Sequence, residues 1–158
     1  MARSLNERFN IDVLSDRLSK LISNATDLSE AMREGADYMV RSTQNRILRQ
    51  KVSPSGKVWD MNGPATISIK GFNSPLFRTG ALADGIRAQR VTRNGFTIAS
   101  TARSDDGTDY GALMQKGIPK YKMRGMIKKR RVPARPFLGF SQENIRRLSQ
   151  ILKTHLTG

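Results

Sequence analysis

The sequence predicts an α+β fold: N-terminal helices, a small antiparallel β-sheet with an Asn-Gly hairpin, a long basic loop and a C-terminal helix. Two observations carry this prediction. Apolar residues recur at helical spacing near both ends of the chain. Between them, an Asn-Gly pair separates two alternating segments, which is typical of a β-hairpin. A chain of 158 residues is expected to form a single domain, with a helical part (1–50), a β-rich core with loops (51–140) and a terminal helix (141–156).

Two segments of the N-terminal part have the apolar periodicity of helices. The first covers residues 11–25, with Asn10 as its cap. The second begins at Thr26 or Asp27, where Asp27 and Glu30 resemble a capping box. The pattern fits either two helices joined by a short turn or one long kinked helix. The inward stripe of the second segment is expected to contain Leu28, Met32, Ala36, Met39, Val40, Thr43 and Ile47, with Arg46 among the residues largely off it.

The segment after residue 50 begins with a turn at residues 53–56, where proline, serine and glycine are clustered. Trp59 follows, and its indole is expected to be hydrogen-bonded and buried in the core or an interface. Residues 65–71 alternate weakly and predict a short exposed strand.

The most regular pattern lies between residues 76 and 117. Thr79 is expected to cap a short helical turn, and residues 86–92 and 96–100 to pair through a type I′ turn at Asn94-Gly95. A short helix is expected over residues 110–116, ended by Gly117. Ser141 is expected to cap the terminal helix, with Ile145, Leu148, Ile151, Leu152 and Leu156 facing inward.

Positive charge is concentrated in one part of the chain. The net charge is +15, from 28 Lys and Arg against 13 Asp and Glu. Between Ile118 and Pro136 the sequence has no acid. The basic residues of this stretch, here called the basic segment, are Lys120, Lys122, Arg124, Lys128, Lys129, Arg130, Arg131 and Arg135. Such a segment is either a solvated loop or a contact surface for nucleic acid or an acidic subunit.

The sequence does not favour an enzyme. There is no cysteine, and the single histidine, His155, lies close to the C-terminus. Neither a Cys/His nucleophile system nor a serine triad with a well-placed base is indicated. The acids at 105, 106 and 109 lack the spacing of a calcium loop and are better explained by turn formation and helix capping. We therefore expect no catalytic residue, no metal and no cofactor.

Residues 132–140, here called the arm, read Val-Pro-Ala-Arg-Pro-Phe-Leu-Gly-Phe. Pro133 and Pro136 fix φ and favour an extended backbone in the residues before them. The arm should therefore present Arg135, Phe137 and Leu138 in a set order. From the sequence, it is either an interior strand or a surface that docks on a neighbour.

The chain resembles the virion morphogenesis (tail-completion) proteins of tailed bacteriophages, including Mu-like phages. The resemblance covers about residues 6–156 and follows an ordered series of motifs. These are Ser-Pro-Ser-Gly-Lys-Val-Trp at 53–59, Pro-Leu-Phe-Arg-Thr-Gly-Ala-Leu at 75–82, the Asn-Gly hairpin, Tyr-Gly-Ala-Leu-Met-Gln-Lys-Gly at 110–117 and Val-Pro-Ala-Arg-Pro-Phe-Leu-Gly at 132–139. Members usually have Tyr-Ala and a His-x-x-Gly-like stretch where this chain has Tyr110-Gly111 and residues 114–117.

The resemblance implies a structural virion protein, made in the bacterial cytoplasm, that acts in tail completion and head–tail joining. The expected assembly is a homo-oligomeric ring at the neck, a hexamer, in contact with portal-side or tail-tube proteins. The expected interface anchors are Trp59, Phe77, Pro133, Arg135, Pro136, Phe137 and Leu138. The basic segment would face DNA in the lumen or an acidic neighbouring ring. The alternatives are a nucleic-acid-binding protein that contacts the DNA or RNA backbone, and a hydrolase built on the acidic cluster.

Overall fold

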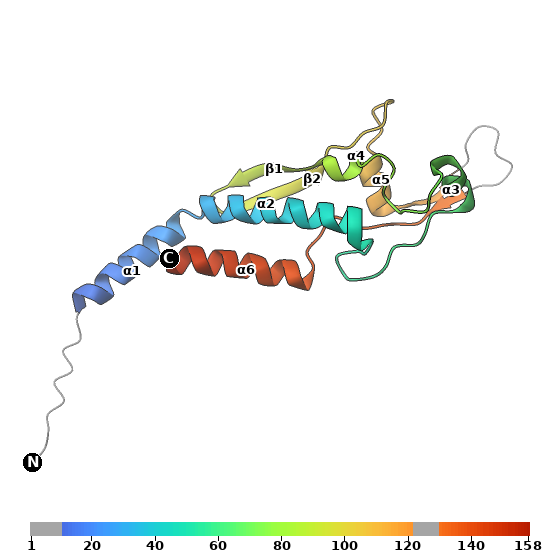
Figure 1. Cartoon of the computed structure of the whole chain (residues 1–158). Helices are drawn as coiled ribbons and strands as arrows, with labels where there is room; N and C mark the ends of the chain where they lie inside the picture. The colour runs from blue at the N-terminus through green and yellow to red at the C-terminus, as the bar shows by residue number, and fades with distance from the viewer. Residues whose placement is uncertain (1–10, 122–129) are drawn as a thin grey trace, which may run out of the picture.

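One long helix lies at the centre of the fold. The computed structural model describes residues 11–121 and 130–158. Helix α2 (Ser29–Asn45) continues into a π-helical turn, η1 (Arg46–Gln50). A hairpin of β1 (Ile86–Thr92) and β2 (Gly95–Ser100) lies on one side of α2, and α6 (Gln142–Thr157) lies on the other (Figure 1). These helices and this antiparallel hairpin confirm the predicted α+β class.

Helix α2 buries the stripe predicted from its sequence. Met32, Ala36, Met39, Thr43 and Ile47 are all buried. Gly35 has a packing role, because a Cβ at this position would lie 3.0 Å from Phe96 Cε1 and 3.1 Å from Leu148 Cδ2. The missing side chain thus lets the hairpin and α6 approach the same turn of α2, which offsets the lower helix propensity of glycine.

The N-terminal part contains two helices and not one kinked helix. Helix α1 (Ile11–Thr26) extends beyond the body of the molecule (Figure 1). Near its end, the Asn24 amide donates to the His155 carbonyl at 3.0 Å, and Lys20 donates to the Gly158 carbonyl. The predicted capping box of α2 is wrong, because Asp27 Oδ1 accepts from the Ser29 N–H at 3.0 Å and Leu28 holds the N-cap position without a side-chain bond.

The hairpin confirms the predicted strands but not the predicted turn. Thr92 pairs with Gly95, so Arg93 and Asn94 form the loop. Neither Asn94 nor Gly95 has the positive φ that a type I′ turn requires at its central positions. A register shift between Ala88 and Arg90 also interrupts the alternation of β1.

The strand predicted over residues 65–71 is wrong. The segment forms α3 (Pro64–Lys70), a short helix with no buried residue. Proline at the first helical position and Gly71 in the left-handed conformation at the end are standard helix boundaries, and they override the weak alternation between them.

Between α3 and α6, the chain forms two short helices and a second sheet besides the hairpin. Helix α4 (Ala81–Asp84) has Gly80 and not the predicted Thr79 at its N-cap position, although the Thr79 hydroxyl accepts from the Ala81 N–H at 3.4 Å. Helix α5 (Tyr110–Lys116) is capped by Asp109 and ends at Gly117, as predicted. Strands β3 (Ile118–Tyr121) and β4 (Arg130–Val132) form a second, separate two-stranded sheet that was not predicted.

Helix α6 begins at the predicted cap, Ser141, which forms a capping box by exchanging hydrogen bonds with Asn144. Ile151 is buried, but Ile145 is 47% exposed, so its predicted inward position is wrong. The position next to it, Asn144, is buried instead. A core of Ile47, Trp59, Leu82, Ala83, Ile86, Ala102 and Phe137 lies at the other end of α2 from α1. Among the described residues, no helix has the length and hydropathy needed to span a bilayer.

Candidate functional site

The arm separates two hollows in the surface. Pro133 and Arg135 line one hollow, whereas Ala134, Pro136 and Leu138 line the other. This alternation is what an extended backbone produces, because successive side chains point to opposite sides. The predicted extended conformation of the arm thus gives it two different faces.

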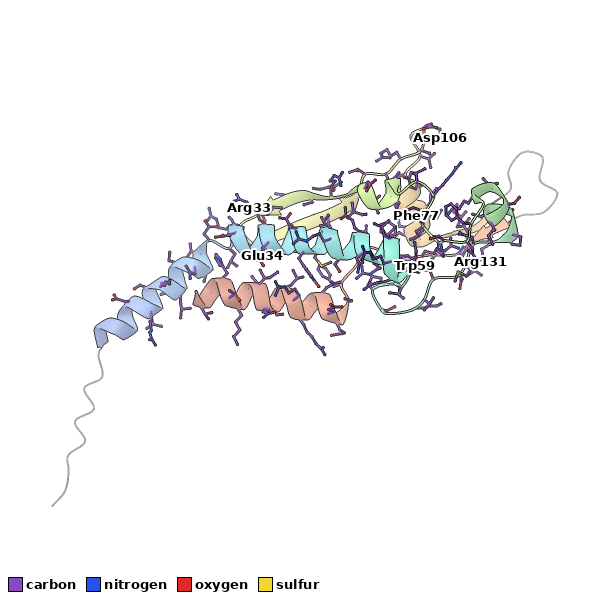
Figure 2. All side chains as sticks on the ribbon, in the orientation of Figure 1. Arg33, Glu34, Trp59, Phe77, Asp106 and Arg131 are labelled. Atoms are coloured by element: carbon purple, nitrogen blue, oxygen red, sulfur yellow. The ribbon has the colours of Figure 1, made fainter. Side chains whose placement is uncertain are left out.

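Phe137 lies inside the chain's own core. Its side chain is fully buried, and Trp59 is buried in the same cluster (Figure 2). The Trp59 indole N–H donates to the Pro136 carbonyl at 3.0 Å, as expected for a hydrogen-bonded tryptophan. At Phe137, therefore, the arm is interior, and only its flanking residues offer a surface.

Gln115 on α5 fixes the backbone of the arm. Its side-chain oxygen accepts from the N–H groups of Phe137 at 2.9 Å and Leu138 at 3.1 Å. Its side-chain nitrogen donates to the Leu138 carbonyl at 3.0 Å. One amide thus acts like the edge of a neighbouring strand and satisfies three backbone groups.

Arg46 fixes the other side of the arm. Its guanidinium donates to the carbonyl of Phe137 at 2.7 Å, to that of Gly139 at 3.4 Å and to Asn144 Oδ1 at 2.9 Å. The Asn144 amide in turn donates to Tyr38 Oη at 3.0 Å and Ser42 Oγ at 2.7 Å. Arg46 is buried, and its burial lowers the pKa of the guanidinium.

The sequence pattern placed Arg46 largely off the inward stripe, and this is wrong. Arg46 follows Met39 and Thr43 at regular helical spacing, so the spacing itself puts it on the inward face beside Ile47. That spacing was the available signal, and the charge of Arg46 argued against it because arginine is rarely fully buried.

Arg135, one of the expected interface anchors, is also buried, at 5% exposure. Its guanidinium donates to the carbonyls of Asp60 at 2.9 Å and Met61 at 3.0 Å. Burial lowers its pKa, and the nearby Asp60 partly opposes this effect. Arg135 therefore ties the loop that follows Trp59 to the arm.

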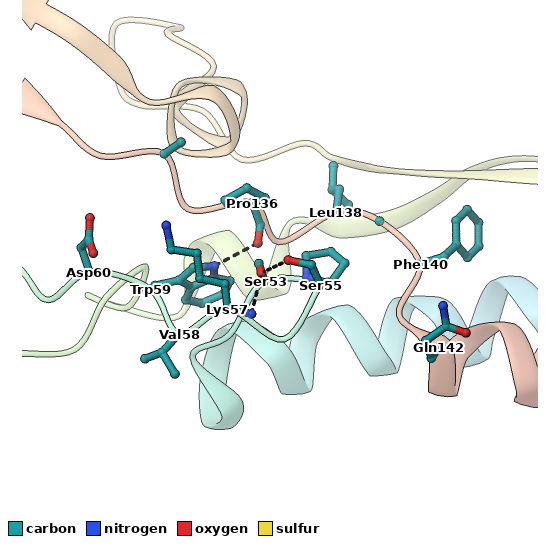
Figure 3. Close-up of a pocket in the computed structure, with 13 residues that line it drawn as sticks. Ser53, Ser55, Lys57, Val58, Trp59, Asp60, Pro136, Leu138, Phe140 and Gln142 are labelled. Atoms are coloured by element: carbon teal, nitrogen blue, oxygen red, sulfur yellow. Dashed lines mark hydrogen bonds between the residues drawn. The ribbon is translucent and has the colours of Figure 1, made fainter.

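One hollow, here called the arm groove, has a volume of about 800 Å³ and lies between the arm and the loop at residues 53–60 (Figure 3). Two of its apolar residues are strongly exposed, Val58 at 63% and Phe140 at 58%, and Leu138 is half-buried. Lys57 and Asp60 supply charge at its rim. Val58 and Phe140 lie toward opposite ends of the hollow (Figure 3), and exposed apolar side chains along a hollow are typical of a protein-binding surface.

The other hollow, here called the basic pocket, has a volume of about 660 Å³. Phe77, one of the predicted anchors, is half-buried in its wall, and Phe72 lies beside it with the ring centroids 5.9 Å apart. Pro133 is half-buried in the same wall, and Arg131 is exposed on it. The predicted anchors are thus divided between the core and the two hollows.

The basic segment is described only at its two ends. Lys120 lies in β3 and Arg130 in β4. Lys122, Arg124, Lys128 and Lys129 lie outside the described residues. Its role as a surface for DNA or a partner therefore stays a prediction from the sequence.

The acidic cluster has a structural use in the turn before α5. Asp106 Oδ1 accepts from Ser104 Oγ at 2.5 Å and the Thr108 N–H at 2.9 Å, and these bonds lower its pKa to about 2. Asp109 accepts from the Ala112 N–H at 2.9 Å. Within the residues that the structure describes, no group of three or more acidic or histidine side chains could hold a metal ion.

The comparison with protein families gives one match. The family model of the phage virion morphogenesis family matches residues 9–157. No curated protein and no solved structure matches the chain significantly.

We predict that Arg46→Met lowers the free energy of unfolding by about 2–4 kcal/mol, because buried carbonyl oxygens lose their donor. The control is Arg41→Met, an exposed position on the same helix, with an expected change within about 0.5 kcal/mol. Chemical denaturation of the two variants measures the difference. Equal stabilities would show that the Arg46 bonds contribute nothing.

We predict that Phe137→Ala lowers the stability of the monomer by about 3–5 kcal/mol, because the ring is fully buried in the chain's own core. Phe140→Ala is the matched control, since that ring is mostly exposed and its loss should leave the melting temperature of the monomer nearly unchanged. Thermal unfolding under dilute conditions tests both. An unchanged melting temperature of the Phe137→Ala monomer would show that the Phe137 side chain contacts a neighbouring subunit and not the monomer's own core.

Proposed function

The chain belongs to the phage virion morphogenesis family, and we propose that within this role it acts in tail completion, as a ring of identical subunits at the junction of head and tail. Its function in building the virion follows from the family match over nearly the whole chain. The ring, its place at the neck and the joining of heads to tails are the further content of the proposal.

The observation that carries the ring is the arm groove. Val58 and Phe140 expose large apolar side chains beside a hollow whose walls are held firmly by Trp59, Gln115 and Arg46. A rigid apolar surface loses little entropy when a partner covers it. If the partner surface lies elsewhere on a second copy, the contact is head-to-tail, and such contacts form a ring when the rotation between copies closes.

A suitable second surface is available at the far end of the molecule. Helix α1 extends away from the body and exposes Leu18, Leu21 and Ile22. The arm groove lies toward the opposite end of α2, beside the core. Two apolar surfaces at opposite ends of an elongated subunit are what a head-to-tail contact requires.

We further propose that the protein acts by assembly and not by catalysis. The acids before α5 are engaged in a turn and a helix cap, and His155 Nε2–H donates to the Asp27 carbonyl at 3.0 Å, where it joins α6 to the α1–α2 turn. The titratable groups that invited a catalytic interpretation thus have structural uses.

The test of the ring is the oligomeric state of the chain and of a groove variant. Native mass spectrometry should give one closed stoichiometry for the unmodified chain, and a hexamer is expected. Phe140→Asp should yield monomers with an unchanged melting temperature, because it buries a carboxylate in the contact and not in the core. Val91→Asp, an exposed apolar position on β1, is the control and should keep the ring. A ring that survives Phe140→Asp would contradict the proposed contact.

The basic segment gives a separate prediction. Neutralising Lys128, Lys129 and Arg130 to Gln should leave the monomer folded but prevent heads from joining tails, because the segment would no longer attract DNA or an acidic ring. Electron micrographs and plaque titres of a phage with this variant measure the effect. The control makes the same change to Gln, and thus the same change in charge, at three exposed arginines: Arg33, Arg41 and Arg146. Normal numbers of complete particles from the first variant would remove the segment from the function.

A further inference from the structure

The basic pocket has an apolar interior. It lies between α3, the segment before α4, helix α5 and the start of the arm, and both Phe77 and Arg131 lie in this end of the molecule (Figure 2). Its apolar wall is formed by Leu76, Phe77, Leu82, Tyr110, Met114 and Val132. The Met114 carbonyl accepts from the Arg135 N–H at 2.8 Å, but the rest of the arm is fixed from Gln115, Arg46 and Trp59. The pocket is therefore a feature to be explained separately from the arm groove.

The wall of this pocket carries more positive than negative charge. Lys70, Arg78, Arg131 and Arg135 line it, against Asp105 alone. The pKa of Lys70 is lowered first by burial and then by the charges of Arg135 and Arg78, so these cations are close enough to repel one another. Within the described residues, none of the four forms an ion pair. An anion at the rim would relieve this repulsion.

An unused hydrogen-bond donor lies in the same wall. Asn62 is only 8% exposed, and its side-chain nitrogen is buried without a hydrogen-bond partner in the described part of the chain. Buried amide groups are nearly always paired in folded proteins. An oxygen atom from a molecule that fills the pocket would supply the missing acceptor.

The aromatic ring in the pocket is poorly placed to stack on a nucleic-acid base. Lys51 Nζ lies 5.6 Å from the centroid of the Phe77 ring, and Phe72 flanks the same ring at 5.9 Å. A stacking platform needs an open ring face, and a backbone-tracking groove needs cations along its length and not around an apolar hollow. The combination of an apolar interior, a basic rim and a free amide donor instead suits a peptide.

We propose that the basic pocket binds a segment of another virion protein in which a large apolar side chain stands next to a carboxylate. The apolar side chain fills the hollow, and the carboxylate lies at the rim near Arg78 and Arg131. A backbone or side-chain oxygen of the segment accepts from Asn62. This inference rests on the proposed assembly role for the nature of the partner, which is a virion component. It does not depend on the ring contact, because that contact uses a different surface.

The test begins with a library of random heptapeptides selected for binding to the purified full chain. The selected peptides should combine an aspartate or glutamate with a neighbouring large apolar residue. Fluorescence anisotropy of one labelled peptide then gives its affinity, beside a copy in which the acid is changed to the matching amide. The amide copy should bind about tenfold more weakly, because the contact with the cations is lost.

Two variants locate the binding. Arg78→Glu should weaken binding of the acidic peptide by about tenfold or more. Arg41→Glu, at an exposed position on α2, should leave the affinity unchanged. Asn62→Leu should also weaken it, yet should not lower the melting temperature, because it removes a buried group that has no partner. A residue with a purely structural role would not combine lost affinity with retained stability.

Several results would overturn the proposal. These are selection of no peptide or of peptides without acids, equal binding by the Arg78→Glu and Arg41→Glu variants, and unchanged affinity in Asn62→Leu. Binding of oligothymidine with the same dependence on Arg78 would make the pocket a nucleic-acid site. Loss of the ring in Arg78→Glu would make its occupant a second copy of this chain. A chain that forms the ring but selects no acidic peptide would refute this inference and leave the proposed ring intact.

Discussion

The buried guanidinium of Arg46 is the contact on which the arrangement of the functional end depends. It joins three segments far apart in the sequence: the end of α2, the arm and the capping box of α6. A buried cation without an acidic partner is unfavourable unless several oxygen atoms surround it, and here two carbonyls and an amide do so. The charge therefore requires the arm to lie where its carbonyls point at α2. Because the arm cannot shift, the core position of Phe137 and the two hollows beside it are set as well.

The two hollows follow from one backbone conformation. Prolines at 133 and 136 keep the arm extended, and an extended chain sends alternate side chains to opposite sides. Pro136 and Leu138 thus border the arm groove, whereas Pro133 and Arg135 border the basic pocket. Trp59 and Arg135 bind carbonyl oxygens on each other's segments, so the loop that encloses both hollows is tied to the same arm. The arm is thus one rigid element with a separate hollow on each side, and these hollows are the two contact surfaces that we propose.

The distribution of charge fits such a component. The chain has a net charge of +15, and only two ion pairs occur among the described residues, both exposed and long at 3.9 Å. Surface pairs of this kind contribute little to stability. The fold is instead held by its apolar core and by charged donors that bind carbonyls, which leaves most of the positive charge available to acidic neighbours.

The sequence by itself determined the elements whose signals are local. Local signals, from residues a few positions apart, gave the stripe of α2, both strands of the hairpin, the Asp109 cap, Gly117 and the Ser141 cap. The ordered motifs were sufficient for the family. Tertiary structure decided the rest. The core position of Phe137, the tolerance of Gly35 and the oxygen atoms that allow Arg46 to be buried all depend on segments far apart in the sequence. Helical and strand periodicity report only which residues share a face, and they cannot report which distant backbone that face meets.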